Sequence, residues 1–91
     1  MPPAARKGDS IGHAGTAILK PCSDDTLINN RKAARQSDIA VHIIPHPPHE
    51  ESITRGSSSV FINGLPAARI GDPVGCGGKI SSGSCDVNIG G

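Results

Sequence analysis

Aromatic residues are almost absent from this chain, whose 91 residues include one Phe and no Trp or Tyr. A core built on aromatic packing is therefore excluded, and a substrate pocket walled by aromatic side chains is not expected. No apolar run approaches the roughly 20 residues that a membrane-spanning helix needs. Residues 1–15 also lack the apolar stretch of a secretory signal peptide, so we expect synthesis in the cytoplasm.

The chain also lacks an excess of charge and a disulfide framework. Its formal net charge is +1. Proteins that bind nucleic acid or a membrane surface by charge usually have a clustered basic face, so the composition argues against both classes. Three cysteines cannot all pair within one chain, and Cys22 and Cys85 are interpreted as small, half-buried residues that fill space. A small chain with 12 Gly and 8 Pro therefore needs another stabilising element, such as a metal ion or a partner.

An internal repeat is the strongest signal in the sequence. Ala-Ala-Arg occurs three times, within residues 3–9, 32–38 and 66–72, and an Asp follows each Arg by three residues. A residue of a type that binds soft metals comes four positions after each Asp. These residues are His13, His42 and Cys76.

A second repeated piece follows the first and aligns without gaps at residues 23–30, 57–64 and 84–91. Its alternation of apolar and polar residues predicts a strand. An Ile recurs at one position of each copy, which predicts a ring of three isoleucines around a pseudo-threefold axis. Three ordinary edge strands of a small sandwich are the alternative. The ring would consist of Ile28, Ile62 and Ile89.

The two repeated pieces together predict one all-β domain over residues 1–91, with repeat pieces at about 3–31, 32–65 and 66–91. Gly, Pro and Ser interrupt every stretch, so helix content should be close to nil. The sequence stops where another Pro-Ala-Ala-Arg is due and starts with that piece. We therefore expect the C-terminal strand to meet the N-terminal segment and close the circle of repeats.

An insertion in the second repeat holds the other two histidines, His46 and His49. Three equivalent ligands that converge near an axis need one more donor to complete a tetrahedron. Three imidazoles and one thiolate suit Zn²⁺ better than hard cations, although iron stays open as the metal. Three prolines within residues 45–48 hold His46 in a stiff turn soon after His42. His49 is therefore the favoured fourth ligand, and His46 is the alternative.

The repeated Asp residues, Asp9, Asp38 and Asp72, allow a carboxylate cluster for acid–base chemistry, and the three Arg residues allow a phosphate-binding ring. The simpler interpretation is structural, with each Asp accepting backbone N–H bonds in a turn and pairing with an Arg. We expect no enzymatic activity. A small zinc hydrolase with water as the fourth ligand is the competing hypothesis, and Cys76 argues instead for a closed site.

Pro-Ala-Ala-Arg at residues 3–6 and 66–69, with Lys-Ala-Ala-Arg at 32–35, resembles the PAAR-repeat family. These are spike-tip proteins of type VI secretion systems and contractile phage tails, and the resemblance covers essentially the whole chain. It implies a short β-cone whose base sits on a trimeric VgrG-type spike and whose apex binds structural zinc. Carried over by position, the zinc ligands are His13, His42, His49 and Cys76.

The function implied by the resemblance is mechanical. The tip would cap and sharpen the spike, and so help membrane puncture and effector delivery, with one chain per trimer. The tip of a phage baseplate is the alternative. The expected partners are the spike, non-covalently bound effectors and, during puncture only, the target membrane; neither nucleic acid nor a second copy is expected. With no room for an appended toxin domain, we expect a stand-alone tip that the type VI apparatus exports outside or into a target cell.

Overall fold

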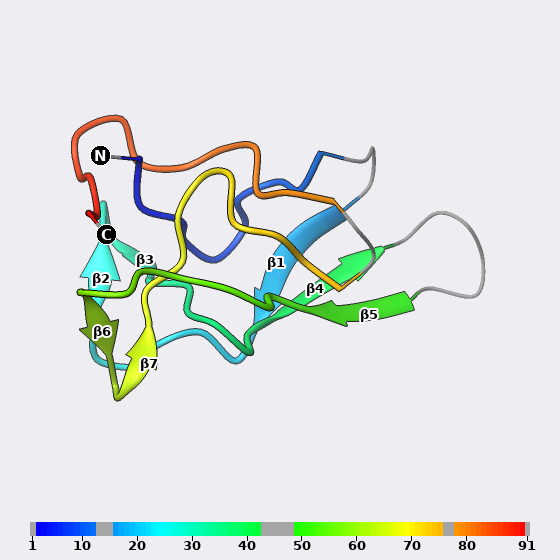
Figure 1. Ribbon diagram of the computed structural model, residues 1–91, viewed down its shortest axis with the longest axis horizontal. Coiled ribbons are helices and arrows are strands. Elements are labelled where there is room, and N and C mark those ends of the chain that lie inside the picture. The colour runs from blue at the N-terminus through cyan, green and yellow to red at the C-terminus, as the bar shows by residue number, and fades with distance from the viewer. Residues whose placement is uncertain (1, 13–15, 43–48, 76–77, 91) are drawn as a thin grey trace.

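The computed structural model describes residues 2–12, 16–42, 49–75 and 78–90, and these form short strands, turns and bends (Figure 1). No helix occurs among them, and so no part of the described chain could cross a membrane as a helix. The all-β prediction is confirmed. The strands are β1 (Thr16–Lys20), β2 (Leu27–Ile28), β3 (Arg31–Lys32), β4 (Ile39–His42), β5 (His49–Ser52), β6 (Phe61–Ile62) and β7 (Leu65–Pro66).

Two of the small antiparallel sheets are hairpins, β2–β3 and β6–β7, each with a two-residue turn. Asn29 and Asn30 have φ of 54° and 66°, and Asn63 and Gly64 have φ of 54° and 79°. Positive φ at both central residues is the signature of a type I′ turn, whose twist suits a tight hairpin. The local sequence therefore determines where each of these hairpins turns.

A third hairpin-like pair is assembled from the two ends of the chain. Pro3 bridges Asn88, and the Ala4 N–H donates to the Val87 carbonyl at 2.9 Å. The predicted closure of the circle is thus confirmed, and the first and last described segments lie on the same side of the molecule in Figure 1. The equivalent bonds in the other repeats run from Ala33 N–H to Thr26 O and from Ala67 N–H to Val60 O, both at 2.9 Å.

The three Ala-Ala-Arg segments hydrogen bond to one another in a closed cycle. Ala5 N–H donates to Ala68 O, Ala68 N–H to Ala34 O, and Ala34 N–H to Ala5 O, each at 3.0 Å. All three side chains are buried. Because three chain segments approach one another here, a side chain larger than Ala would overpack this layer.

The core is a stack of triplets with one residue from each repeat. One hydrophobic cluster contains the predicted isoleucine ring together with the first Ala of each motif. The second cluster contains the second Ala of each motif and a further isoleucine triplet, Ile18, Ile53 and Ile80. Each of these isoleucines donates its N–H to the carbonyl of the motif Asp of its own repeat. The repeat pattern of the sequence does not reveal this triplet, because its members follow the motif Asp by nine, fifteen and eight residues.

The third sheet, β1–β4–β5, belongs to a closed circuit of six antiparallel segments among the described residues. Each repeat contributes two adjacent segments, 10–12 with β1, β4 with β5, and 73–75 with 78–80. Closure leaves no strand of the circuit at a free edge. The bridges that complete it are Ile53 with Val74, Pro73 with Lys79, Ile11 with Ile80, and Ser10 with Ala17.

Candidate metal centre and hairpin end

Two of the predicted metal ligands belong to the six-segment circuit. His42 is the last residue of β4 and His49 is the first residue of β5, and their backbones are direct partners in the antiparallel register. Thr16 of β1 pairs with His42 from the other side. His13, Cys76 and the alternative ligand His46 lie outside the described residues.

Three backbone hydrogen bonds lie within a few residues of the ranges 13–15, 43–48 and 76–77, and two of them join different repeats. Those ranges contain or adjoin all five candidate ligands. The repeats are therefore tied together where the sequence places its metal-binding residues. The bonds run from Gly12 N–H to Lys79 O at 2.9 Å, from Val74 N–H to Gly78 O at 2.9 Å, and from Gly75 N–H to Ser52 O at 3.0 Å.

The repeated Arg and Asp residues form the same paired arrangement in each repeat. Asp9 Oδ2 accepts the backbone N–H of Arg6 at 2.7 Å and its Nε at 3.0 Å, while Oδ1 accepts Nη2 at 3.0 Å. Arg35 with Asp38 and Arg69 with Asp72 repeat these contacts within 0.2 Å. The Asp side chains are buried, and each hydrogen bond to Asp raises the pKa of the partner Arg.

These pairs confirm the structural interpretation of the Arg and Asp residues. In each pair the guanidinium and the carboxylate form bidentate, charge-assisted hydrogen bonds with each other. The carboxylates are therefore not arranged as an acid–base cluster, and the guanidinium groups are not arranged as a phosphate-binding ring. The Asp N–H also donates to the Arg carbonyl three residues earlier and closes a turn. The third turn residue has positive φ, at Gly8 (90°), Ser37 (80°) and Gly71 (94°).

A second repeated network joins neighbouring repeats and was not anticipated. Ser23 Oγ accepts the Thr26 N–H of its own turn at 3.0 Å and donates to Asn63 Oδ1 in the next repeat at 2.6 Å. Ser84 makes the same contacts with Val87 N–H and Asn29 Oδ1. Ser57 accepts from Val60 N–H but donates to the backbone carbonyl of Gly90 at 2.6 Å.

The two asparagines also hold a carboxylate on the neighbouring repeat. Asn63 Nδ2 donates to Asp25 at 2.9 Å, and Asn29 Nδ2 donates to Asp86 at 2.8 Å. These hydrogen bonds lower the pKa of both carboxyl groups. At the third contact Ser59 stands in the Asp position and Gly90 in the Asn position. The Asn amide that would donate and the Asp carboxylate that would accept are therefore both missing there. The sequence signal for this network is a Ser-x-Asp motif that occurs in two repeats and an Asn that occurs in two repeats at one aligned position.

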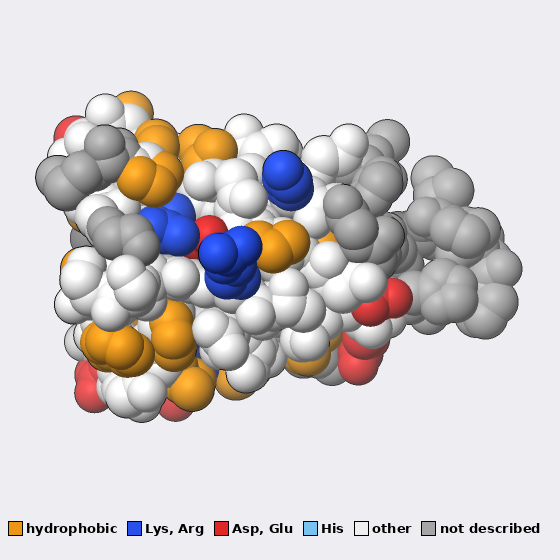
Figure 2. Space-filling view, in the orientation of Figure 1, with side chains coloured by type: hydrophobic (Ala, Val, Ile, Leu, Met, Phe, Trp, Pro, Cys, Tyr) orange, Lys and Arg blue, Asp and Glu red, His pale blue; other side chains and the backbone are white. Residues whose placement is uncertain are grey.

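Exposed apolar side chains gather at the end formed by the hairpins, called here the hairpin end. Leu27 and Phe61 are 59% and 57% exposed, and Val60 and Val87 are about a third exposed. Figure 2 shows hydrophobic side chains with acidic ones beside them at the end where β2 and β6 lie. The six-segment circuit leads toward the opposite end of the molecule (Figure 1).

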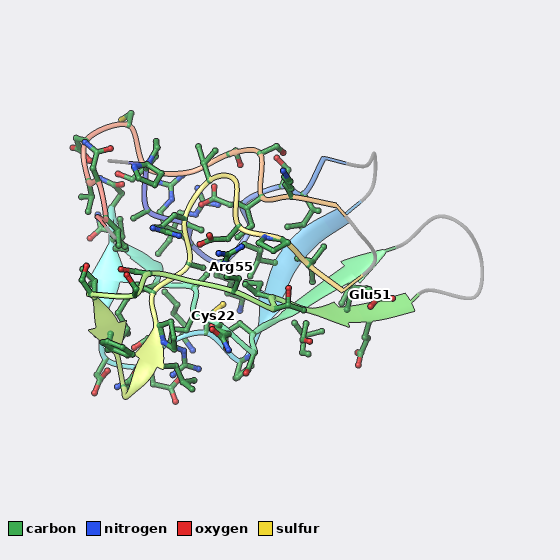
Figure 3. All side chains as sticks on the ribbon, in the orientation of Figure 1. Cys22, Glu51 and Arg55 are labelled. Carbon is green, nitrogen blue, oxygen red and sulfur yellow. The ribbon has the colours of Figure 1, made fainter. Side chains whose placement is uncertain are left out.

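The two described cysteines differ in environment, contrary to the expectation that both are half-buried. Cys22 is buried in the core and lies in the middle of the molecule in Figure 3, whereas Cys85 is exposed, and both are free. Burial raises the pKa of the Cys22 thiol from 9.0 to about 11. Cys22 stands where the other repeats have Gly56 and Gly83, and it has φ of 54° beside a register shift in β1.

Comparison with protein families identifies this arrangement of repeats. The family model described as the PAAR motif matches residues 7–82. The chain belongs to the PAAR motif family. Because the match spans most of the chain, the repeats, the closed cycle and the Arg–Asp turns described above are features of a PAAR domain.

Three toxins resemble the chain over most of its length. The NAD(P)(+) glycohydrolase toxin Tse6 and the (p)ppApp synthetase toxin Tas1, from two strains of Pseudomonas aeruginosa, are each 36% identical to it over 83 residues. The double-stranded DNA deaminase toxin A of Burkholderia cenocepacia is 38% identical over 85 residues. The alignments cover 84–88% of this chain but only 19% of the first two toxins and 6% of the third.

Proposed function

We propose that this PAAR domain is the tip of a type VI secretion spike, a structural protein that caps a trimeric VgrG-type spike and carries effectors with it. The observation that carries the proposal is the closed cycle of equivalent contacts among three repeats of one chain. Such a chain can continue the symmetry of a homotrimer while one copy covers its blunt end. The exposed apolar hairpin end supplies the docking surface.

The mechanism proposed for the tip is mechanical, and no bond is made or broken. The blunt end of a trimeric β-helix leaves strand edges unpaired. A pseudo-threefold chain that tapers to a cone would cover these edges and concentrate the thrust of sheath contraction on a small area of membrane. We propose that the chain is made in the cytoplasm and leaves the cell on the spike, with effectors bound to it or to its partner.

A structural zinc ion at the opposite end is the second part of the proposal. His13, His42, His49 and Cys76 would hold it, and bound zinc would pin the three hairpins of the circuit together. The closed circuit and the bonds that border the ligand-bearing ranges support this site. The direct pairing of His42 with His49 supports His49 as the fourth ligand. A closed set of three imidazoles and a thiolate is typical of structural zinc.

Calorimetric titration of the chain into a purified spike trimer tests the docking function. We expect one chain per trimer and an affinity in the micromolar range or tighter. Replacement of the exposed Phe61 by Asp should weaken this binding strongly without unfolding the chain, since Phe61 is 57% exposed. A folded native chain that does not bind the trimer at micromolar concentration contradicts the spike-tip proposal.

Elemental analysis of the native protein beside His49→Ala and His46→Ala tests the metal site. We expect one zinc per chain, retained by His46→Ala and largely lost by His49→Ala. The reverse pattern would assign His46 as the ligand, and a metal-free native chain would reject the site. In the cobalt-substituted protein a thiolate charge-transfer band would show that Cys76 is bound. Its absence, together with coordination above four, would favour the hydrolase hypothesis.

A further inference from the structure

The hairpin end carries fixed negative charge next to its exposed apolar side chains. Asp86 accepts a hydrogen bond from Asn29 Nδ2 at 2.8 Å, and its Oδ1 lies 2.9 Å from Ser84 Oγ, whose single proton it shares with Asn29 Oδ1. Asp25 is held in the same way: Asn63 Nδ2 donates to it at 2.9 Å, and Ser23 Oγ lies 3.0 Å away and shares its proton between Asp25 and Asn63 Oδ1. Both carboxylates are exposed and each lies within two residues of an exposed apolar residue.

The basic side chains near the hairpin end are paired with other groups. Arg6 and Arg35 donate to the same two asparagines, but each is paired with the buried Asp of its own motif. Lys32 Nζ pairs with Asp24 at 3.0 Å, which neutralises that carboxylate. Arg31 extends away from the hairpin end, with Nε donating to the Lys7 carbonyl at 2.9 Å and Nη2 3.5 Å from Asp9. The charge that remains beside the apolar side chains is therefore that of Asp25 and Asp86.

The hydrogen bonds make these two carboxylates suitable as docking charges. They lower the pKa of both groups, so both are ionised at neutral pH. They also restrict the side chains before any partner binds, which reduces the conformational entropy that a contact would cost. At the third contact Ser59 replaces the carboxylate. Of the three equivalent positions, called here the corners of the hairpin end, only those of Asp25 and Asp86 are therefore charged.

We infer that the hairpin end docks on a spike end that presents Lys or Arg side chains around an apolar centre, with Asp25 and Asp86 each facing one cation. This inference rests on the proposed function, because it names the chemistry of the spike surface that the tip would cover. Because the spike is threefold and the tip has two charged corners, one spike cation would face Ser59. Charge complementarity of this kind mainly sets the association rate and its salt dependence.

The test uses calorimetry and stopped-flow association of the full chain with the purified spike trimer at about 50 mM and about 300 mM salt. The Debye length falls about 2.5-fold between these two conditions. The variants are Asp25→Ser, Asp86→Ser and their combination, each copying Ser59. Ser59→Asp adds the missing third charge. Glu51→Gln removes one negative charge on β5, far from the hairpin end, and serves as the matched control (Figure 3).

At low salt we expect each Asp→Ser change to weaken binding about threefold, chiefly through slower association, and the double variant to show a flatter salt dependence. Ser59→Asp should tighten low-salt binding by a similar factor, and Glu51→Gln should leave it unchanged. Native-like affinity and salt dependence in the folded double variant would overturn the inference while leaving the spike-tip proposal intact. Failure of the native chain to bind would overturn both.

Discussion

The three contacts between repeats differ in how they satisfy the same hydrogen-bond donors. Two contacts use an Asn side chain that accepts from a Ser hydroxyl and an Arg guanidinium and donates to an Asp. The third uses the Gly90 carbonyl, which accepts from Ser57 at 2.6 Å and from Arg69 at 3.4 Å. The Gly90 carbonyl can replace the Asn side-chain oxygen as the acceptor, but it cannot replace the Asn amide as the donor. Because Ser59 stands in the Asp position, no carboxylate at this contact requires that donor.

The comparison shows which elements of the repeat are required at every contact and which are exchangeable. The buried Arg–Asp pair and the Ala layer occur three times with the same geometry, whereas the Asn–Asp pair occurs twice. Unpaired buried charge is costly, so a departure at the Arg–Asp pair would not be compensated by a simple neighbouring change. An exposed Asn–Asp pair contributes less and can be lost.

The largest expected effect comes from breaking the element that all three repeats share. Asp38→Asn leaves the mostly buried guanidinium of Arg35 without its counter-charge and should cost about 3–5 kcal/mol of unfolding free energy. Asp9→Asn and Asp72→Asn should cost similar amounts, because their pairs have the same geometry. Urea unfolding of the native and variant proteins measures this. A loss below about 1 kcal/mol at any of the three sites would show that the pair is not essential there.

A smaller effect is expected when one of the two Asn contacts is converted toward the third. Asn63→Gly keeps the left-handed turn but removes the partner of Ser23, Arg35 and Asp25, and should cost about 1–3 kcal/mol. Asn30→Gly changes a turn residue of positive φ outside this network and controls for the backbone effect. Equal unfolding free energies for the two variants would mean that the Asn network contributes nothing measurable.

The regular features were predictable from the sequence because they repeat in phase with short spacing. Ile28, Ile62 and Ile89 occupy one place in an ungapped piece, so their ring could be predicted and is confirmed. Ile18, Ile53 and Ile80 play the same role, but the number of residues between each of them and its motif Asp differs, which hides their equivalence in the sequence. Their equivalence becomes visible only through the Asp carbonyls to which they bond.

The sequence contains the residues of the Asn network in phase, but it does not show which of them pair with one another. The network pairs residues of neighbouring repeats, such as Ser23 with Asn63, which are 40 positions apart in sequence. Only the closed arrangement of the repeats brings them together. The structural role of Arg6 with Asp9 could be predicted because a carboxylate three residues after a turn residue satisfies local N–H groups. The zinc ligands remain a prediction, since His13 and Cys76 lie outside the described residues.

The Arg-x-x-Asp turn offers a comparison within one element. Ser37 has φ of 80° where the other two repeats have Gly8 and Gly71. Glycine adopts this conformation at little cost, so Ser37→Gly should stabilise the protein by about 0.5–1 kcal/mol. Gly71→Ser should destabilise it by about 1 kcal/mol, although the side chain would enter open space. Thermal unfolding measures both variants. Changes in stability of opposite sign would confirm the prediction, and changes of the same sign would reject the explanation from φ.

The smallest effect at neutral pH concerns Cys22, the core thiol in place of a repeat glycine. Its pKa is raised from 9.0 to about 11 on folding, chiefly by burial. The unfolded chain therefore loses the thiol proton first as the pH rises. The stability that the protonated thiol contributes is present below pH 9 and is lost as the pH rises through about 11. Cys22→Ala keeps the buried β-carbon and does not titrate, so its unfolding free energy should fall less steeply than that of the native protein between pH 9 and 11. Parallel pH curves for the two proteins would show that some other group governs alkaline unfolding.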